Sequence, residues 1–139
     1  MRTVVPLFAL SLLTALGTGT TPVAQAQDGK GLARHAKFTV VNPTKYTLRY
    51  EVRWGNGEWD ATTLKPNESY THWYDKHNEF PDVHIRFSKI VNPIDEVPRQ
   101  TYRLEPRWVT ERKGKVVEGT PKVYRFNVKD SKVGLTGDP

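Results

Sequence analysis

Hydrophobic and polar side chains alternate most regularly between Tyr46 and Trp54. In an extended chain one set is apolar, Leu48, Tyr50, Val52 and Trp54, and the intervening set carries Arg49, Glu51 and Arg53. A period of two is typical of a strand with one buried and one solvated face. Residues 37–41 alternate in the same way, and the residues between, 42–45, are turn formers. The sequence therefore predicts that these two strands form a hairpin.

Short alternating segments recur at residues 58–64, 69–74, 83–87, 100–110 and 123–129. Pro106 lies inside the segment 100–110 and cannot donate a ladder hydrogen bond, so we expect an edge strand, a bulge or two shorter strands there. No segment keeps a helical period. The pattern predicts an all-β fold, a small antiparallel β-sandwich of about seven short strands.

We place the sandwich domain at residues 37–129, with a flexible N-terminal segment at 27–36 before it and a flexible tail at 130–139 after it. The parity of each strand assigns a set of apolar residues to the inner faces of the two sheets. The predicted core is Phe38, Val40, Leu48, Tyr50, Val52, Trp54, Val83, Ile85, Phe87, Tyr102, Leu104, Tyr124, Phe126 and Val128.

The N-terminus has the order of a secretory signal peptide. Arg2 precedes an uncharged apolar run at residues 4–16, and small residues follow, ending in Ala24-x-Ala26. Because the run is too short for a permanent membrane-spanning helix, we predict a signal peptide over 1–26 that is cleaved after Ala26. We therefore expect a secreted, periplasmic or extracellular protein with no membrane span after cleavage. An uncleaved N-terminal anchor is the alternative.

The chain without this segment is small, basic and free of disulfides. Removing 26 of 139 residues leaves 113, the size of one domain, and the sequence contains no cysteine. The removed segment carries one basic residue, Arg2, and no acidic one, so the formal net charge falls from +6 to +5. That charge favours anionic surroundings but is too sparse to predict specific nucleic-acid binding.

One pattern occurs twice in the chain. Residues 47–54 and 101–108 both read T-x-R-x-E-x-R-W, which fits either a duplicated half-sandwich or two unrelated amphipathic strands. In both readings the charged faces are solvated. Arg49 and Arg53 form one basic row and Arg103 and Arg107 another, and we expect one sheet face to present both rows to an anionic ligand.

Aromatic residues supply the other indication of a ligand. Trp59, Trp73 and Tyr74 are candidates to stand exposed beside the arginines and stack on a flat apolar group such as a sugar ring. Alternatively, most of the aromatic side chains build the core of a small domain that has no disulfides.

A metal site has weak candidates. His72, His77 and His84 lie near Asp75, Glu79 and Asp82, and imidazole and carboxylate groups bind metals when they converge. Their spacing matches no known metal motif, so isolated exposed or half-buried histidines are the alternative. The sequence also lacks a cysteine nucleophile, a G-x-S-x-G elbow, a phosphate loop and an H-E-x-x-H helix. We therefore expect neither an enzyme nor a cofactor.

The succession Asn42-x-Thr44, Trp54, Gly57, Leu64-x-Pro66 and His72-x-Tyr74 is similar to the short-strand sandwich of the von Hippel–Lindau β domain. The resemblance covers about a third of the chain and implies a sandwich face that binds peptide.

Together these features predict a secreted, non-catalytic β-sandwich that acts as a binding or structural module. Its expected partner is an anionic extracellular or envelope polymer, or another envelope protein. Two alternatives remain open, a protein–protein interaction module that uses a sheet face or edge strand, and a metal-dependent enzyme.

Overall fold

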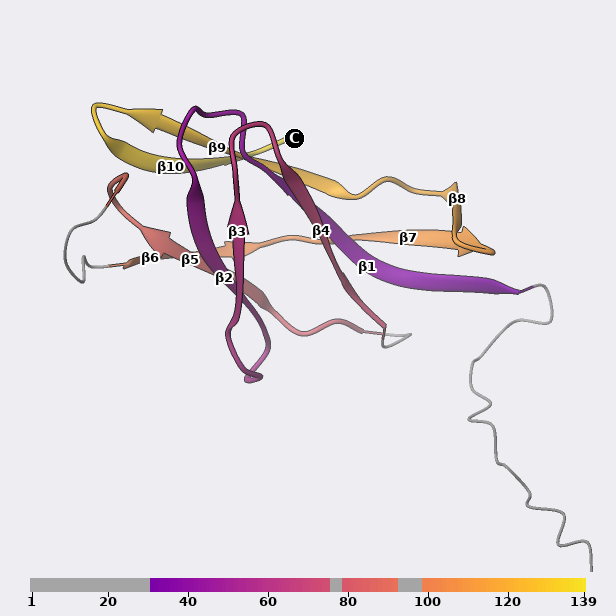
Figure 1. Cartoon of the computed structure of the whole chain (residues 1–139). Coiled ribbons are helices and arrows are strands. Elements are labelled where there is room, and N and C mark those ends of the chain that lie inside the picture. The colour runs from indigo at the N-terminus through magenta and orange to yellow at the C-terminus, as the bar shows by residue number, and fades with distance from the viewer. Residues whose placement is uncertain (1–30, 76–78, 93–98) are drawn as a thin grey trace, which may run out of the picture.

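The computed structural model describes residues 31–75, 79–92 and 99–139 and consists of strands and turns (Figure 1). Ten strands follow one another: β1 (Leu32–Val41), β2 (Leu48–Trp54), β3 (Asp60–Leu64), β4 (Ser69–Tyr74), β5 (Val83–Ser88), β6 (Arg99–Leu104), β7 (Arg107–Arg112), β8 (Lys115–Glu118), β9 (Lys122–Lys129) and β10 (Lys132–Gly137). The predicted signal peptide, residues 1–26, lies outside the described residues. Among the described residues, no helix is long and apolar enough to cross a membrane.

The strands form two sheets, which confirms the all-β sandwich. One sheet has four strands in the order β3-β2-β5-β6, all antiparallel. The other has six strands, with the path β10-β9-β1-β7-β8 and with β4 paired to β1. The long β1 organises this second sheet, because β7 pairs with residues 32–37 and the parallel β9 with residues 38–41 (Figure 1).

The predicted hairpin between residues 37–41 and 46–54 is wrong. Both segments are strands, but β1 belongs to the six-stranded sheet and β2 to the four-stranded sheet, so the intervening turn carries the chain from one sheet to the other. Asn42 fixes this crossing. It is fully buried, and its backbone N–H donates to Glu68 O at 2.9 Å while its carbonyl accepts from Asn67 N–H at 2.7 Å. The turn is therefore bonded to the β3–β4 turn, not to its own neighbouring strand.

The ends of the domain also differ from the prediction. Residues 32–36, predicted as part of a flexible segment, belong to β1, and residues 132–137, predicted as a flexible tail, form β10 against β9. Asp130 and Ser131 both have positive φ and make the tight turn between these strands. The break at Pro106 is confirmed, since β6 ends before it and β7 begins after it in the other sheet. Together with β8, these changes raise the predicted seven strands to ten.

The core lies between the sheets and contains most of the predicted residues. Rings from both sheets meet there, with Phe126 of β9 at 5.6 Å from Tyr50 and 5.1 Å from Phe87 between ring centroids. Trp54 and Val128 are only partly buried at its margin. Tyr102, which the sequence predicts in the core, is 39% exposed because β6 is an edge strand. The Tyr102 ring stacks on Phe87 at the margin of the core.

Candidate binding face

The outer face of the four-stranded sheet carries most of the basic side chains that the sequence marks as candidate ligand-binding residues. Alternation along β2 buries Leu48, Tyr50 and Val52 and turns Arg49, Glu51 and Arg53 outward. We call this surface, formed by the outward residues of β2, β3, β5 and β6, the arginine face.

The strand register adds further arginines to this face. Arg86 of β5 lies opposite Glu51, and His84 lies between Arg53 on one side and Arg103 on the other. Arg99 lies opposite Ser88, on the same side of β6 as Arg103. Five arginines and a single carboxylate, Glu51, therefore share one side of the sheet: Arg49, Arg53, Arg86, Arg99 and Arg103.

Trp59 lies on the arginine face beneath two guanidinium groups. The residue directly precedes β3, and the register that pairs Val52 with Asp60 places it opposite Arg53. The guanidinium carbon of Arg53 is 4.6 Å from the centroid of the Trp59 ring, and that of Arg86 is 4.1 Å from it. Both distances fit cation–π contact. The ring is half-buried, so it supports the arginines and does not stand free as a platform.

Glu51 orders two more arginines. Its Oε2 accepts a hydrogen bond from Arg86 Nε at 2.6 Å and another from a terminal guanidinium nitrogen of Arg99. The hydrogen bond from Arg86 is the main cause that lowers the pKa of the Glu51 carboxyl, so the group stays ionised. One carboxylate therefore bridges β5 and β6 and aligns two positive groups over the sheet.

The remaining arginines differ in how they are paired. Arg103 donates to Asp82 Oδ1 at 2.7 Å at the rim, where both side chains are well exposed. Arg49 is exposed and forms no ion pair within the part of the chain that the structure describes. Nε of Arg53 and Nδ1 of His84 are buried without a hydrogen-bond partner among the described residues. Of these groups, the exposed guanidinium of Arg49 therefore keeps N–H donors that no described residue uses.

Arg107 does not belong to this face, contrary to the prediction that the two basic rows share one sheet. The break at Pro106 sends Arg107 into β7 of the six-stranded sheet, where its guanidinium donates to Pro139 O at 2.6 Å. The second copy of the repeated pattern thus divides between two sheets, whereas all of the first copy from Leu48 onward lies in the single strand β2. The copies do not have the same structure, which favours two unrelated amphipathic strands.

Trp73 and Tyr74 also lie elsewhere, on β4 of the six-stranded sheet. Tyr74 is half-buried and stacks on Trp54 with ring centroids 5.1 Å apart. Trp73 is 53% exposed on the opposite side of β4, beside a hydrogen bond of 2.8 Å between the hydroxyls of Thr39 and Thr71. Trp73 is therefore the exposed aromatic of the predicted set, and it does not lie on the arginine face.

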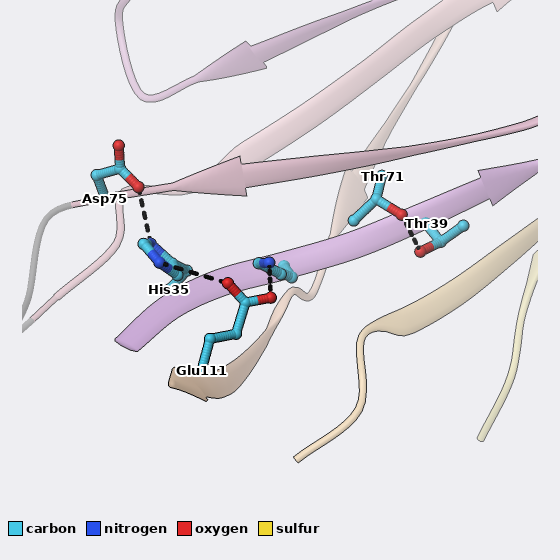
Figure 2. A network of polar contacts seen from close by, with 6 residues as sticks. His35, Thr39, Thr71, Asp75 and Glu111 are labelled. Carbon is cyan, nitrogen blue, oxygen red and sulfur yellow. Dashed lines mark hydrogen bonds and ion pairs between the residues drawn. The ribbon is translucent and has the colours of Figure 1, made fainter. Parts of the chain in front are cut away.

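A second polar group lies on this outer surface of the six-stranded sheet (Figure 2). His35 Nδ1 is 2.7 Å from Asp75 Oδ1, its Nε2 is 3.8 Å from Glu111 Oε2, and Lys37 pairs with the other oxygen of Glu111. The group therefore contains two carboxylates beside one lysine and one imidazole. In contrast to the arginine face, it offers no excess of positive charge to an anionic ligand.

The candidate metal ligands do not converge. His72 is buried on the inner side of β4, where Nε2 lies 2.8 Å from Tyr50 Oη and the ring stacks on Phe38 at 4.9 Å. His84 faces outward from the other sheet, and His77 lies outside the described residues. Burial lowers the pKa of His72 to about 4, so its imidazole is neutral at pH 7. Across residues 31–75, 79–92 and 99–139, no group of three potential ligands could hold a metal ion.

A small hollow of about 140 Å³ lies between residues of both sheets. Leu48, Arg49, Phe87 and Phe126 are among the residues that line it. Its lining reaches Val91 and Asn92, where the described chain is interrupted, and we assign it no function.

No protein-family model matches the chain, and no curated protein matches it.

Two members of the arginine face, Arg86 and Arg99, are not among the predicted ligand-binding residues. Alternation in residues 83–87 places Arg86 outward, but only the pairing of β5 with β2 and β6 brings it beside Arg53 and Glu51.

Proposed function

We propose that this chain is an exported, non-catalytic binding module whose arginine face binds an anionic polymer. The observation that carries the proposal is the concentration of five arginines on one side of a four-stranded sheet against one carboxylate of that face, Glu51. Charges of one sign on a surface attract a ligand of opposite charge and raise its local concentration.

The balance of charge on the face supports this proposal. Glu51 neutralises one positive charge, and Asp82 at the rim offsets that of Arg103. Arg49 and Arg53 keep their charge unpaired among the described residues. Because screening limits such attraction to about 8 Å at physiological ionic strength, a ligand must lie directly on the face to benefit from it. An extended polymer can do so over the whole width of the sheet.

The experiment that tests this function measures retention of the protein on an immobilised polyanion over a series of salt concentrations. Arg49→Glu exchanges an exposed positive charge for a negative one, and a charge near an anionic surface is worth on the order of 1 kcal/mol, so we expect about 2 kcal/mol weaker binding. Arg112→Glu makes the same change at an exposed position of β7 in the other sheet and is the matched control. We expect the control to elute close to the unmodified protein.

Three results oppose the proposal. One is the absence of retention even at low ionic strength. Another is retention that does not respond to salt, which indicates apolar or protein-interaction contacts instead of charge. Equal loss of retention in Arg49→Glu and Arg112→Glu is a third contrary result, because it attributes binding to net charge and not to the arginine face.

A second candidate function has its own observation, the exposure of Trp73 beside the hydroxyls of Thr39 and Thr71. A flat ring flanked by hydrogen-bonding groups suits a sugar ring of a neutral polysaccharide. Quenching of tryptophan fluorescence by neutral oligosaccharides, abolished by Trp73→Ala and kept by Trp59→Phe, supports this candidate. Quenching that survives Trp73→Ala rejects it.

A further inference from the structure

Every lysine or arginine position in the strands of the arginine face is occupied by arginine. The chain contains 11 lysines and 10 arginines, and half of these arginines stand in β2, β5 and β6, whereas β2, β3, β5 and β6 contain no lysine. Lysine would supply the same charge, and its long stem would cover the sheet equally well. Arginine differs in having a planar fork of five N–H donors that fits two oxygens of a carboxylate or phosphate at once.

We infer that the arginine face binds its polymer through individual oxyanions, each held by a guanidinium fork with paired hydrogen bonds, so that geometry as well as charge selects the ligand. The inference rests on the proposed function and names its ligand chemistry: a chain of repeated carboxylate or phosphate groups. The inference differs from that function in one measurable respect. It requires arginine at these positions, whereas attraction by positive charge alone is satisfied equally well by lysine.

Trp59 contributes the first part of this arrangement. At 4.6 Å and 4.1 Å from the ring centroid, the guanidinium groups of Arg53 and Arg86 are held against an aromatic surface. Such contact uses the flat side of a guanidinium and leaves N–H donors on its edges free. Trp59 is therefore a positioning residue, and its ring fixes the directions of the two forks before a ligand arrives.

Glu51 contributes the second part. It accepts hydrogen bonds from Nε of Arg86 and from one terminal nitrogen of Arg99, and this leaves the other terminal nitrogens of both arginines able to donate. A single carboxylate thus orients two forks without occupying either one completely. Ordering side chains in advance reduces the conformational entropy that binding would otherwise cost.

The spacing of the arginines indicates several oxyanions and not one. Arg49 and Arg53 are four residues apart on β2, about 13 Å at roughly 3.3 Å per residue. Arg53 and Arg103 are separated by one intervening strand, about 10 Å at the usual distance between strands. Positions this far apart favour separate oxyanions over one shared group. A polymer can fill several forks at once, and linked contacts increase its affinity beyond that of each oxyanion alone.

The test compares arginine with lysine at equal net charge. Binding of the full chain to polygalacturonate, as the carboxylate probe, and to inorganic polyphosphate, as the phosphate probe, is measured by titration at fixed ionic strength. Arg49→Lys is the decisive variant, because Arg49 is exposed and has no ion pair within the described ranges, so its replacement leaves the fold intact. We expect Arg49→Lys and Arg53→Lys each to weaken binding by roughly three- to tenfold, the loss of about one charged hydrogen bond. Arg112→Lys in the other sheet is the matched control and should bind like the unmodified protein.

The same titrations examine the positioning role of Trp59. Trp59→Ala removes no charge and is expected to weaken binding, whereas Trp59→Phe keeps a ring and should restore most of it. Thermal unfolding of each variant separates loss of binding from loss of folding. If Trp59→Ala folds and binds as tightly as the unmodified protein, the positioning role is wrong.

The outcomes separate this inference from the function on which it depends. If Arg49→Lys and Arg53→Lys bind as tightly as the unmodified protein while Arg49→Glu does not, the polymer senses only charge, and the inference is overturned while the function stands. If neither probe binds, both are overturned. Loss of affinity in the lysine variants supports the inference, and the probe that binds identifies carboxylate or phosphate as the source of the oxyanion.

Discussion

Asn42→Ala should destabilise the fold strongly, because one buried amide group holds two turns together. The two N–H bonds of the Asn42 side-chain amide are shared among three backbone carbonyls, Tyr46 O at 2.7 Å, Leu64 O at 3.0 Å and Lys65 O at 3.1 Å from the nitrogen. Its amide oxygen accepts from the backbone N–H and the hydroxyl of Thr44. A fully buried side chain thus ties the crossing from β1 to β2 to the turn that follows β3.

The magnitude follows from the groups that lose a partner. The bond to Leu64 is buried, and leaving that carbonyl unsatisfied costs about 2 kcal/mol, within the usual range for such groups. The other two carbonyls are partly reached by water, and about 1 kcal/mol for each is appropriate. The sum is about 4 kcal/mol, a large fraction of the roughly 5–15 kcal/mol that stabilises a domain.

The assay is urea unfolding followed by tryptophan fluorescence, with the free energy of unfolding compared between variants. Thr44→Val, which removes a single half-buried hydroxyl, is the control and should cost only about 1 kcal/mol. Asn42→Asp keeps the shape but offers no N–H donor, so it should be about as damaging as Asn42→Ala at pH 7. A loss below about 1 kcal/mol for Asn42→Ala would refute the view that this side chain holds the two turns together.

Two further predictions concern titration and backbone conformation. Burial lowers the pKa of His72 from 6.5 to about 4, so the unfolded chain binds a proton more readily than the folded one between these values. The free energy of unfolding should therefore fall by roughly 3 kcal/mol from this residue as pH decreases from about 6.5 to 4. The difference in this free energy between the unmodified protein and His72→Gln should depend on pH over that window. A difference that stays constant contradicts the role given to His72. Gly119 has φ of +78°, and an added Cβ would lie 2.4 Å from Trp108 O, whereas Gly114 has φ of +74° with nothing near its added Cβ. Gly119→Ala should therefore lower the melting temperature clearly more than Gly114→Ala, and equal shifts would show that the close approach is relieved by movement.

Strands were predictable from sequence where alternation is local and strong. Val83, Ile85 and Phe87 are buried as their parity requires, because the period of two depends only on the extended backbone. The break at Pro106 was predictable for an equally local reason, the missing N–H donor. β10 was missed because its Gly134 and Gly137 weaken the apolar pattern, although Val133 and Leu135 alternate and pack against the core.

The choice of partner strand was not predictable in the same way. A turn after residue 41 is compatible both with a hairpin and with a crossing between the two sheets. The hydrogen bonds that decide between them join Asn42 to Leu64 and Lys65, more than twenty residues away. The same limit explains the arginine face. Four of the residues predicted from sequence do lie on one face: Arg49, Arg53, Arg103 and Trp59. The prediction for Arg107 is wrong, because the chain passes from one sheet to the other at Pro106.

Mapping the contact surface tests the central claim most directly. In an NMR titration of the protein with a short polyuronate oligomer, binding to the arginine face predicts that the indole N–H of Trp59 and the Nε–H of Arg53 and Arg86 shift most, together with backbone amides of β2, β5 and β6. Increasing the salt concentration should reverse these shifts. Shifts centred on Trp73 and β4, or no shifts at low ionic strength, would contradict the claim that the arginine face binds an anionic polymer.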